Sequence, residues 1–193
     1  MPRTVEAMTI TWNSRLLEQL TWHWTEQLRP RLDGLTDDEY LWEPVPGAWN
    51  LRPRGAARTA RTGGSGDLVV EFALPAPEPA PVTTIAWRLA HIIVGVLGMR
   101  NAAHFGGPAT NYDDHEYAPT AKAALEQLDE QYDRWTAGVR ALGEEGLAEP
   151  CGPSEGPWAD APKADLVLHI HREVIHHGAE IALLRDLYAH GLR

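Results

Sequence analysis

The sequence predicts an all-α protein, a four-helix bundle with a long irregular insertion between its first and second helices. Three observations support this prediction. Four long segments repeat apolar residues at the three- and four-residue spacing of an amphipathic helix. Turn-forming residues separate these segments, and only one stretch has the composition of a strand. Finally, 193 residues of which 44% are hydrophobic suit a single domain, which we expect to span residues 1–193.

The first helix is expected at residues 10–32, where apolar residues recur on one face. Thr9 or Thr11 is expected to cap it, because a threonine at the start of a helix accepts a hydrogen bond from a backbone N–H of the first turn. Asp33-Gly34 ends this helix, and a short capped helical turn, TDDEYLWEP, follows. The apolar face of the first helix consists of Leu17, Leu20, Trp24 and Leu28.

Residues 45–82 are the least helical part of the chain. This insertion combines four arginines, a glycine cluster and a proline–alanine run, and residues 68–74 are expected to form a strand, at most within a short β-hairpin. Arg52 and Arg54 are candidates for binding an anionic group of the substrate or cofactor, because guanidinium pairs with carboxylate. The alternative is that the insertion is a solvated, mobile loop without a binding role. The glycine cluster is not followed by Lys-Ser/Thr, which excludes a nucleotide-binding phosphate loop.

The second helix is expected to begin at Thr83 or Thr84 and to continue to Phe105. It is apolar on most sides, which is typical of a helix in the middle of a bundle. His91 is the only ionisable residue in its apolar part. Taken alone, a histidine in such a place is more often a satisfied core residue than a ligand.

The third helix is expected to begin at Pro119 and to end at Gly143. No polar residue interrupts its inward stripe, so we expect this helix to be structural. The stripe consists of Ala121, Leu125, Leu128, Tyr132, Trp135, Val139 and Leu142.

The fourth helix is expected at residues 162–190, and its inward stripe contains two residues that a plain core would not. Glu173 and His177 stand one turn apart, where i and i+4 side chains lie on the same face. Burying an unpaired carboxylate costs several kcal/mol, so a compensating group is needed. A divalent metal supplies it, and His91 is the natural partner on a facing helix. We therefore predict a metal site formed by His91, Glu173 and His177.

Two histidines and one carboxylate are a ligand set typical of catalytic zinc, which keeps a fourth position for water or substrate. Nickel or iron would also accept this set, so the expected cofactor is a divalent metal, zinc first. There are two alternatives. The residues could form a buried polar network, without a metal or with a metal that only stabilises the bundle, or Glu173 and His177 could act as acid and base without a metal. The residues expected around the ligands are His169, His171, His176 and Glu180. His169 is also an alternative ligand, because it lies one turn before Glu173.

The charge of the chain excludes some classes of partner. The 17 Lys and Arg stand against 27 Asp and Glu, and the formal net charge of −10 argues against binding to nucleic acid or to anionic membranes. A small-molecule substrate is expected instead. The single cysteine, Cys151, cannot form an intrachain disulfide, and no segment has the pattern of a signal peptide or a membrane span. We therefore expect a cytoplasmic protein.

Two parts of the sequence resemble a known family. PGAWNLR followed by TTIAWRLAHI, and the later REVIHHGAEI, are similar to the signature regions of the DinB-like superfamily of four-helix metalloenzymes, which includes mycothiol-dependent maleylpyruvate isomerase and bacillithiol transferases. The resemblance implies that His91 is the metal-binding histidine after the tryptophan segment. It also implies that Glu173 and His177 occupy the later His-x-x-x-His pair. Glu173 departs from the commoner histidine, although the isomerase branch is similar in having Glu-x-x-x-His.

The resemblance also implies a function. It indicates a metal-dependent enzyme, a transferase or isomerase that uses a low-molecular-weight thiol such as mycothiol, with a metal-activated thiolate or water. It further implies a homodimer. A metal-dependent hydrolase and a non-catalytic metal-binding or stress-response scaffold are the alternative functions. The insertion at residues 45–82 interrupts a connection that is usually tight in the family.

Overall fold

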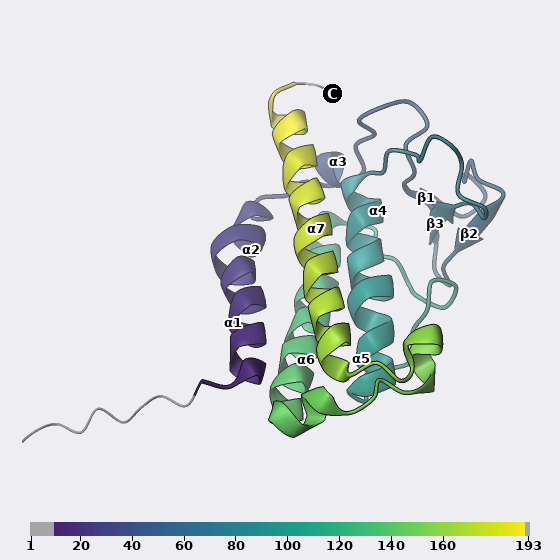
Figure 1. Ribbon diagram of the computed structural model, residues 1–193. Coiled ribbons are helices and arrows are strands. Elements are labelled where there is room, and N and C mark those ends of the chain that lie inside the picture. The colour runs from purple at the N-terminus through teal and green to yellow at the C-terminus, as the bar shows by residue number, and fades with distance from the viewer. Residues whose placement is uncertain (1–9, 192–193) are drawn as a thin grey trace, which may run out of the picture.

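A computed structural model describes residues 10–191 of the chain, which are mostly helical and include a small three-stranded sheet (Figure 1). The α-helices are α1 (Trp12–His23), α2 (Arg29–Arg31), α3 (Asp37–Tyr40), α4 (Ile85–Ala90), α5 (Met99–His104), α6 (Ala121–Ala148) and α7 (Lys163–Ala189). The strands are β1 (Leu51–Pro53), β2 (Arg61–Gly63) and β3 (Leu68–Phe72). Two π-helical segments and one 3₁₀ helix complete the set, η1 (Trp24–Leu28), η2 (His91–Gly98) and η3 (Pro153–Trp158).

The long helices lie side by side, and two of them are built from several consecutive elements. α1, η1 and α2 form one continuous rod, and α4, η2 and α5 form another. In Figure 1, α1 and α7 run upward, whereas α6 and the rod that contains α4 run downward. Both η2 and α1 pack against α6 and α7. The rod with His91 and the helix with Glu173 and His177 are therefore neighbours.

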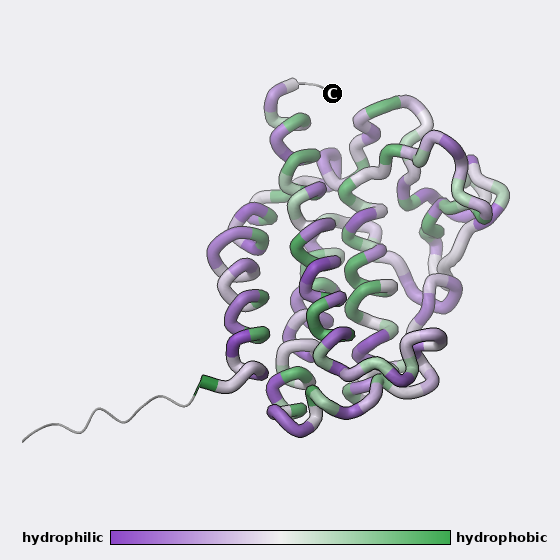
Figure 2. Tube along the Cα trace, in the orientation of Figure 1, coloured by the Kyte–Doolittle hydropathy of each residue, from purple (hydrophilic) through white to green (hydrophobic). Residues whose placement is uncertain are grey.

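The hydrophobic core lies between these helices. In Figure 2 the apolar parts of the trace alternate with polar parts along each rod, as expected for amphipathic helices that share one core. The predicted stripe of α6 is confirmed, since its first six residues are buried and Leu142 is packed against the core. Fully buried side chains from the other rods include Leu20, Leu89, Ile92, Leu97 and Ile181.

Two predicted helix caps, Thr11 and Thr84, are confirmed. The Thr11 hydroxyl accepts a hydrogen bond from the Ser14 N–H at 3.2 Å, and the Thr84 hydroxyl accepts one from the Trp87 N–H at 3.2 Å. Each bond satisfies a first-turn donor that lacks an intrahelical partner. Thr9, the other candidate cap of the first helix, lies outside the described residues.

The prediction that Gly143 ends the third helix is confirmed for the regular helix, but the sequence does not predict the second helical stretch that follows it across a kink. α6 continues to Ala148, and Gly143 interrupts it with a φ of 61°. A glycine adopts this left-handed conformation without a Cβ clash, so the backbone turns there and resumes a helical path. The start of α6 also differs from the prediction, because Thr120 caps it and the helix begins at Ala121.

The insertion contains more strand than the sequence predicts. The strand expected at residues 68–74 is observed as β3, but β3 lies between two antiparallel partners instead of one, in the order β1-β3-β2. Val70 is paired with Leu51 on one side and with Gly63 on the other. β1 and β2 have three residues each, which is too short for an alternating pattern to be detected in the sequence.

A buried ion pair holds the insertion together. The Glu71 side chain is 1% exposed, and its Oε2 accepts hydrogen bonds from Arg52 Nε at 2.8 Å and from the Asn50 N–H at 3.1 Å. Its Oε1 accepts a third bond from the Arg58 N–H at 2.6 Å. Arg52 also pairs with Glu43 at 2.9 Å. The charge of Glu71 is therefore compensated within the sheet and the loop beside it.

Across residues 10–191, none of the helices combines the length and the apolar character that crossing a membrane requires.

Replacing Glu71 with Gln should lower the stability of the protein by about 3 kcal/mol, because it leaves the Arg52 guanidinium largely buried beside a neutral group. Thermal unfolding followed by circular dichroism measures the change. Glu78→Gln is the matched control, since Glu78 is exposed in the same insertion. Equal melting temperatures for the two variants would contradict a stabilising role of the buried pair.

Candidate metal centre

His91 lies where regular helix gives way to π-helix. It is the C-terminal neighbour of α4 and the first residue of η2, in which the Met99 N–H bonds to the Val94 carbonyl five residues earlier. Such π-helical segments occur frequently at functional sites, because the extra residue per turn redirects side chains. The His91 ring lies 4.7 Å from the His177 ring on α7, centroid to centroid, and almost perpendicular to it.

The three side chains singled out in the sequence come together. Glu173 and His177 are one turn apart on α7, and Oε2 of Glu173 lies 3.4 Å from Nε2 of His177. Taking one candidate ligand atom from each of His91, Glu173 and His177, the three atoms lie within 4.8 Å of one another. Two separate rods thus contribute nitrogen and oxygen atoms to one small volume.

Neighbouring polar groups orient both histidines. His177 Nδ1 lies 2.6 Å from Glu180 Oε2, and that carboxylate also pairs with Arg88 Nε at 3.0 Å. His177 Nε2 is therefore left to face Glu173 and His91. His91 Nδ1 lies 2.6 Å from the Tyr112 hydroxyl. Contacts of this kind fix the ring orientation and the tautomer of histidines that bind metals.

The absence of a side chain at Gly95 permits the contact between His91 and Tyr112. A Cβ at this position would lie 1.9 Å from the Tyr112 hydroxyl oxygen and 3.3 Å from His91 Nδ1. The tyrosine comes from the connection between α5 and α6, outside any helix. A glycine one turn after His91 therefore lets a loop residue reach the imidazole.

The environment keeps His91 uncharged near neutral pH. Burial, followed by the electrostatic effects of His177, Arg88 and Arg100, lowers the pKa of His91 to about 4. Burial also raises the pKa of Tyr112 to about 12, so the phenol keeps its proton. A neutral imidazole offers the lone pair that a metal requires.

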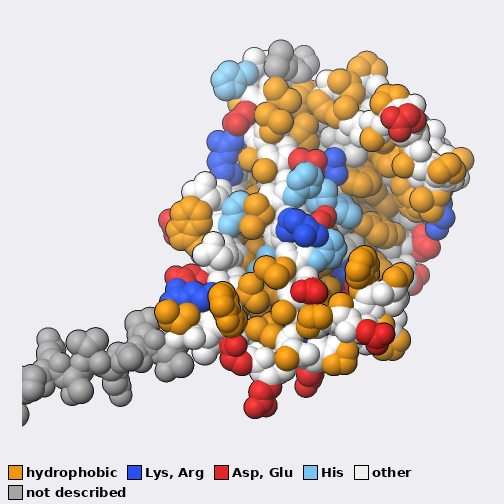
Figure 3. Space-filling model, viewed as in Figure 1, with side chains coloured by type: hydrophobic (Ala, Val, Ile, Leu, Met, Phe, Trp, Pro, Cys, Tyr) orange, Lys and Arg blue, Asp and Glu red, His pale blue; other side chains and the backbone are white. Residues whose placement is uncertain are grey.

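The donor set fits a divalent ion. A carboxylate that is only 27% exposed faces two imidazoles, and a cation placed among them would neutralise it. Two nitrogen ligands and one oxygen ligand are a common zinc set, and nickel and iron accept them too. A hollow of about 250 Å³ lined by His91, Tyr112 and Glu173 gives access from outside. Figure 3 shows histidine side chains gathered on this face over α7, with acidic and basic side chains beside them.

The other histidines predicted around the ligands have different environments. His169 is half-exposed, and its Nδ1 lies 3.6 Å from Glu173 Oε1. His171 is buried against Trp135, away from the solvent-facing hollow, and burial lowers its pKa to about 4. His176 is exposed, and it forms with His177 and Glu180 a second group of possible ligands that overlaps the first.

Arg52 and Arg54 do not lie among these groups. Arg52 is occupied by Glu71 and Glu43, and Arg54 donates hydrogen bonds to the carbonyls of Gly64 and Gly66 at 2.6 and 2.9 Å. Both guanidinium groups thus stabilise the insertion, and neither lines the hollow at the three-residue cluster.

Sequence reasoning did not select Arg88 or Tyr112 as part of the cluster's surroundings. Arg88 lies three residues before His91, at a spacing that places both on one helix face. That spacing is a signal that could have identified it. Tyr112 lies in an irregular connection, so no periodicity in the sequence indicates its position.

Comparison with protein families matches residues 66–181 to the DinB superfamily, and this stretch includes His91, Glu173, His177 and Glu180. Comparisons with curated proteins and with solved structures found no match. The family match covers more than half of the chain and includes the cluster-bearing parts of both helices. The chain therefore belongs to the DinB superfamily.

Proposed function

We propose that this protein is a divalent-metal-dependent enzyme, a thiol-dependent transferase or isomerase. The observation that carries the proposal is the convergence of His91, Glu173 and His177 from two rods onto one volume that opens to solvent. Membership in the DinB superfamily supports it. We also propose that the four long rods form the four-helix bundle expected from the sequence, and that the protein is a homodimer.

In this proposal the chain's own residues hold and orient the centre. His91, Glu173 and His177 hold the ion, with zinc as the first choice. Glu180 orients His177, and Tyr112 orients His91. When bound, a divalent ion supplies a Lewis acid that lowers the pKa of a water or thiol beside it.

The access to the cluster favours catalysis over a purely structural role. Structural zinc sites are closed by four protein ligands, whereas catalytic sites keep a position open. The cluster has three ligand-type residues, and a hollow borders two of them, His91 and Glu173. The competing functions are a metal-dependent hydrolase and a non-catalytic metal-binding scaffold.

Replacing His177 with Ala should remove most of the bound zinc, because the imidazole that Glu180 orients is itself one of the three proposed ligands. Elemental analysis of the purified protein and of the variant measures the metal-to-chain ratio. His190→Ala is the matched control, since His190 is an exposed histidine at the C-terminal end of α7, belongs to neither group of possible ligands, and should leave the ratio unchanged. An unchanged ratio in the His177 variant would count against this centre.

Replacing Glu180 with Gln should weaken zinc binding by about 10- to 100-fold, because the group that orients His177 no longer carries a charge. Competition with a chromogenic chelator measures the affinity. Glu126→Gln serves as the control, because Glu126 lies exposed on α6 and pairs only loosely with Lys122 at 3.8 Å. Equal affinities in the two variants would show that Glu180 does not act on the centre.

Removal of the metal should abolish turnover of an electrophilic substrate with a low-molecular-weight thiol, and added zinc should restore it. The assay compares protein before chelation, after chelation and after zinc is returned. A scaffold would instead show a lower melting temperature after chelation and no turnover in any state. A hydrolase would turn over ester substrates without the thiol, and full activity after chelation would overturn the metal-dependent proposal.

A further inference from the structure

A larger cavity adjoins the candidate metal centre. It has a volume of about 610 Å³, within the usual size range of small-molecule sites. Arg100 and His169 line both this cavity and the hollow of about 250 Å³ at the cluster. The two spaces therefore share these two side chains as parts of their walls.

Arg100 stands at this junction with unused hydrogen-bonding capacity. Its Nη1 donates to the Gly95 carbonyl at 2.8 Å, while its Nη2 lies 3.5 Å from Glu155 Oε2. Its Nε is buried and has no hydrogen-bond partner among the described residues. A guanidinium has five N–H donors, and these contacts occupy one on each Nη, so the second N–H of each Nη remains for a ligand, whereas the buried Nε is out of reach from the cavity.

The contact of Glu155 with Arg100 is long for a hydrogen bond. Glu155 Oε1 lies 2.9 Å from His104 Nε2, and both of these side chains are almost fully buried. The distance of 3.5 Å to Arg100 is at the limit of a hydrogen bond. Glu155 thus contacts His104 closely through Oε1 and Arg100 only at the limit of a hydrogen bond through Oε2, while Arg100 lines the cavity.

The rest of the cavity suits a small organic molecule. Cys151 and Leu166 are buried apolar parts of its wall, and Trp158, which is 71% exposed, supplies a flat aromatic surface. Glu155 and Asp165 also line it. The wall thus carries two carboxylates and two guanidinium groups, Arg100 and Arg172, and this balance disfavours a doubly charged phosphate more than a single carboxylate.

We propose that this cavity binds the substrate through a single carboxylate that Arg100 accepts, so that the reacting group of the substrate extends to the neighbouring cluster. The substrate class is a small carboxylic acid with an apolar portion against Trp158. This inference rests on the proposed function for the position of the reacting group. The anion site itself rests on Arg100 and the cavity alone.

Two thiols that differ in one group test the proposal. Mercaptopropionate carries a carboxylate where mercaptoethanol carries a hydroxyl, and calorimetric titration into zinc-loaded protein gives the affinity of each. Charge-assisted bonds to Arg100 should make mercaptopropionate bind at least about tenfold more tightly than mercaptoethanol. Arg100→Gln should remove this preference.

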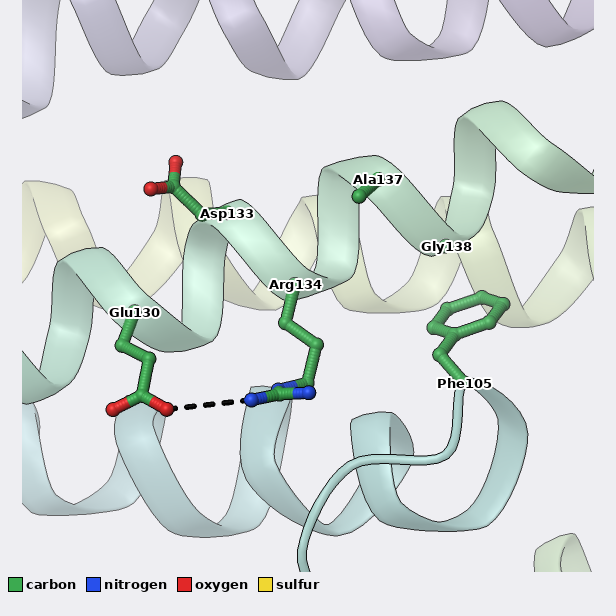
Figure 4. Close-up of a pocket in the computed structure, with 6 residues that line it drawn as sticks. All are labelled: Phe105, Glu130, Asp133, Arg134, Ala137 and Gly138. Atoms are coloured by element: carbon green, nitrogen blue, oxygen red, sulfur yellow. Dashed lines mark hydrogen bonds and ion pairs between the residues drawn. The ribbon is translucent and has the colours of Figure 1, made fainter.

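Arg134 provides a matched control for the titrations. It lies on α6 in a separate surface cavity with Glu130 and Phe105, none of which belongs to the cluster (Figure 4). Its exposure of 34% is close to the 26% of Arg100, and its Nε is likewise buried without a hydrogen-bond partner. Arg134→Gln should therefore keep the preference for mercaptopropionate.

The outcomes separate this inference from the proposed function. If the protein binds zinc but shows no preference, or if Arg100→Gln keeps it, the carboxylate site is refuted. If Arg100→Gln does not fold, Arg100→Lys takes its place. A preference for mercaptopropionate that falls by about threefold or more supports the role of the planar guanidinium, and an unchanged preference refutes it. If the wild-type protein binds no zinc, the proposed function fails. Titration of the zinc-free protein with propionate then decides, since weaker binding in the Arg100 variant alone upholds the inference.

Discussion

The packing of η2 against α7 brings a carboxylate and two imidazoles into one partly buried volume. Taken out of water, such a carboxylate requires compensation, and this requirement accounts for the polar contacts that surround it. Glu180 and Arg88 hold one imidazole, and Tyr112 holds the other. The apolar core on the remaining faces of both rods fixes the distance between them, so the geometry of the cluster depends on helix packing as much as on its own contacts.

Much of the helical framework could be predicted because its signals are local. Helical spacing of apolar residues located the long rods, and the threonine caps located two of their starts. His91, Glu173 and His177 stood out because each replaces hydrocarbon in an apolar stripe, and family resemblance pointed to the same positions. Their proximity follows once the two helices pack side by side. The family match agrees with the resemblance, whereas the metal and the reaction remain proposals.

The features that sequence reasoning missed depend on contacts between distant segments. The edge strands of the insertion are stabilised by pairing with β3, which no local pattern reveals. Gly143 ends the regular helix as the sequence predicts, but the sequence does not predict the helical stretch beyond it, whose Leu147 is buried in the core. Arg52 and Arg54 looked like free cations because their partners Glu43, Glu71 and two glycine carbonyls lie elsewhere in the chain.

The bare backbone at Gly95 links three parts of the chain that would otherwise vary independently. Its α-carbon leaves room for the phenol from the connection between α5 and α6, which in turn holds the imidazole that begins η2. A relative with alanine at this position would have to shorten or withdraw its aromatic residue, and with it the loop that carries that residue. We therefore expect the glycine and the tyrosine to be retained or lost as a pair during divergence within the superfamily.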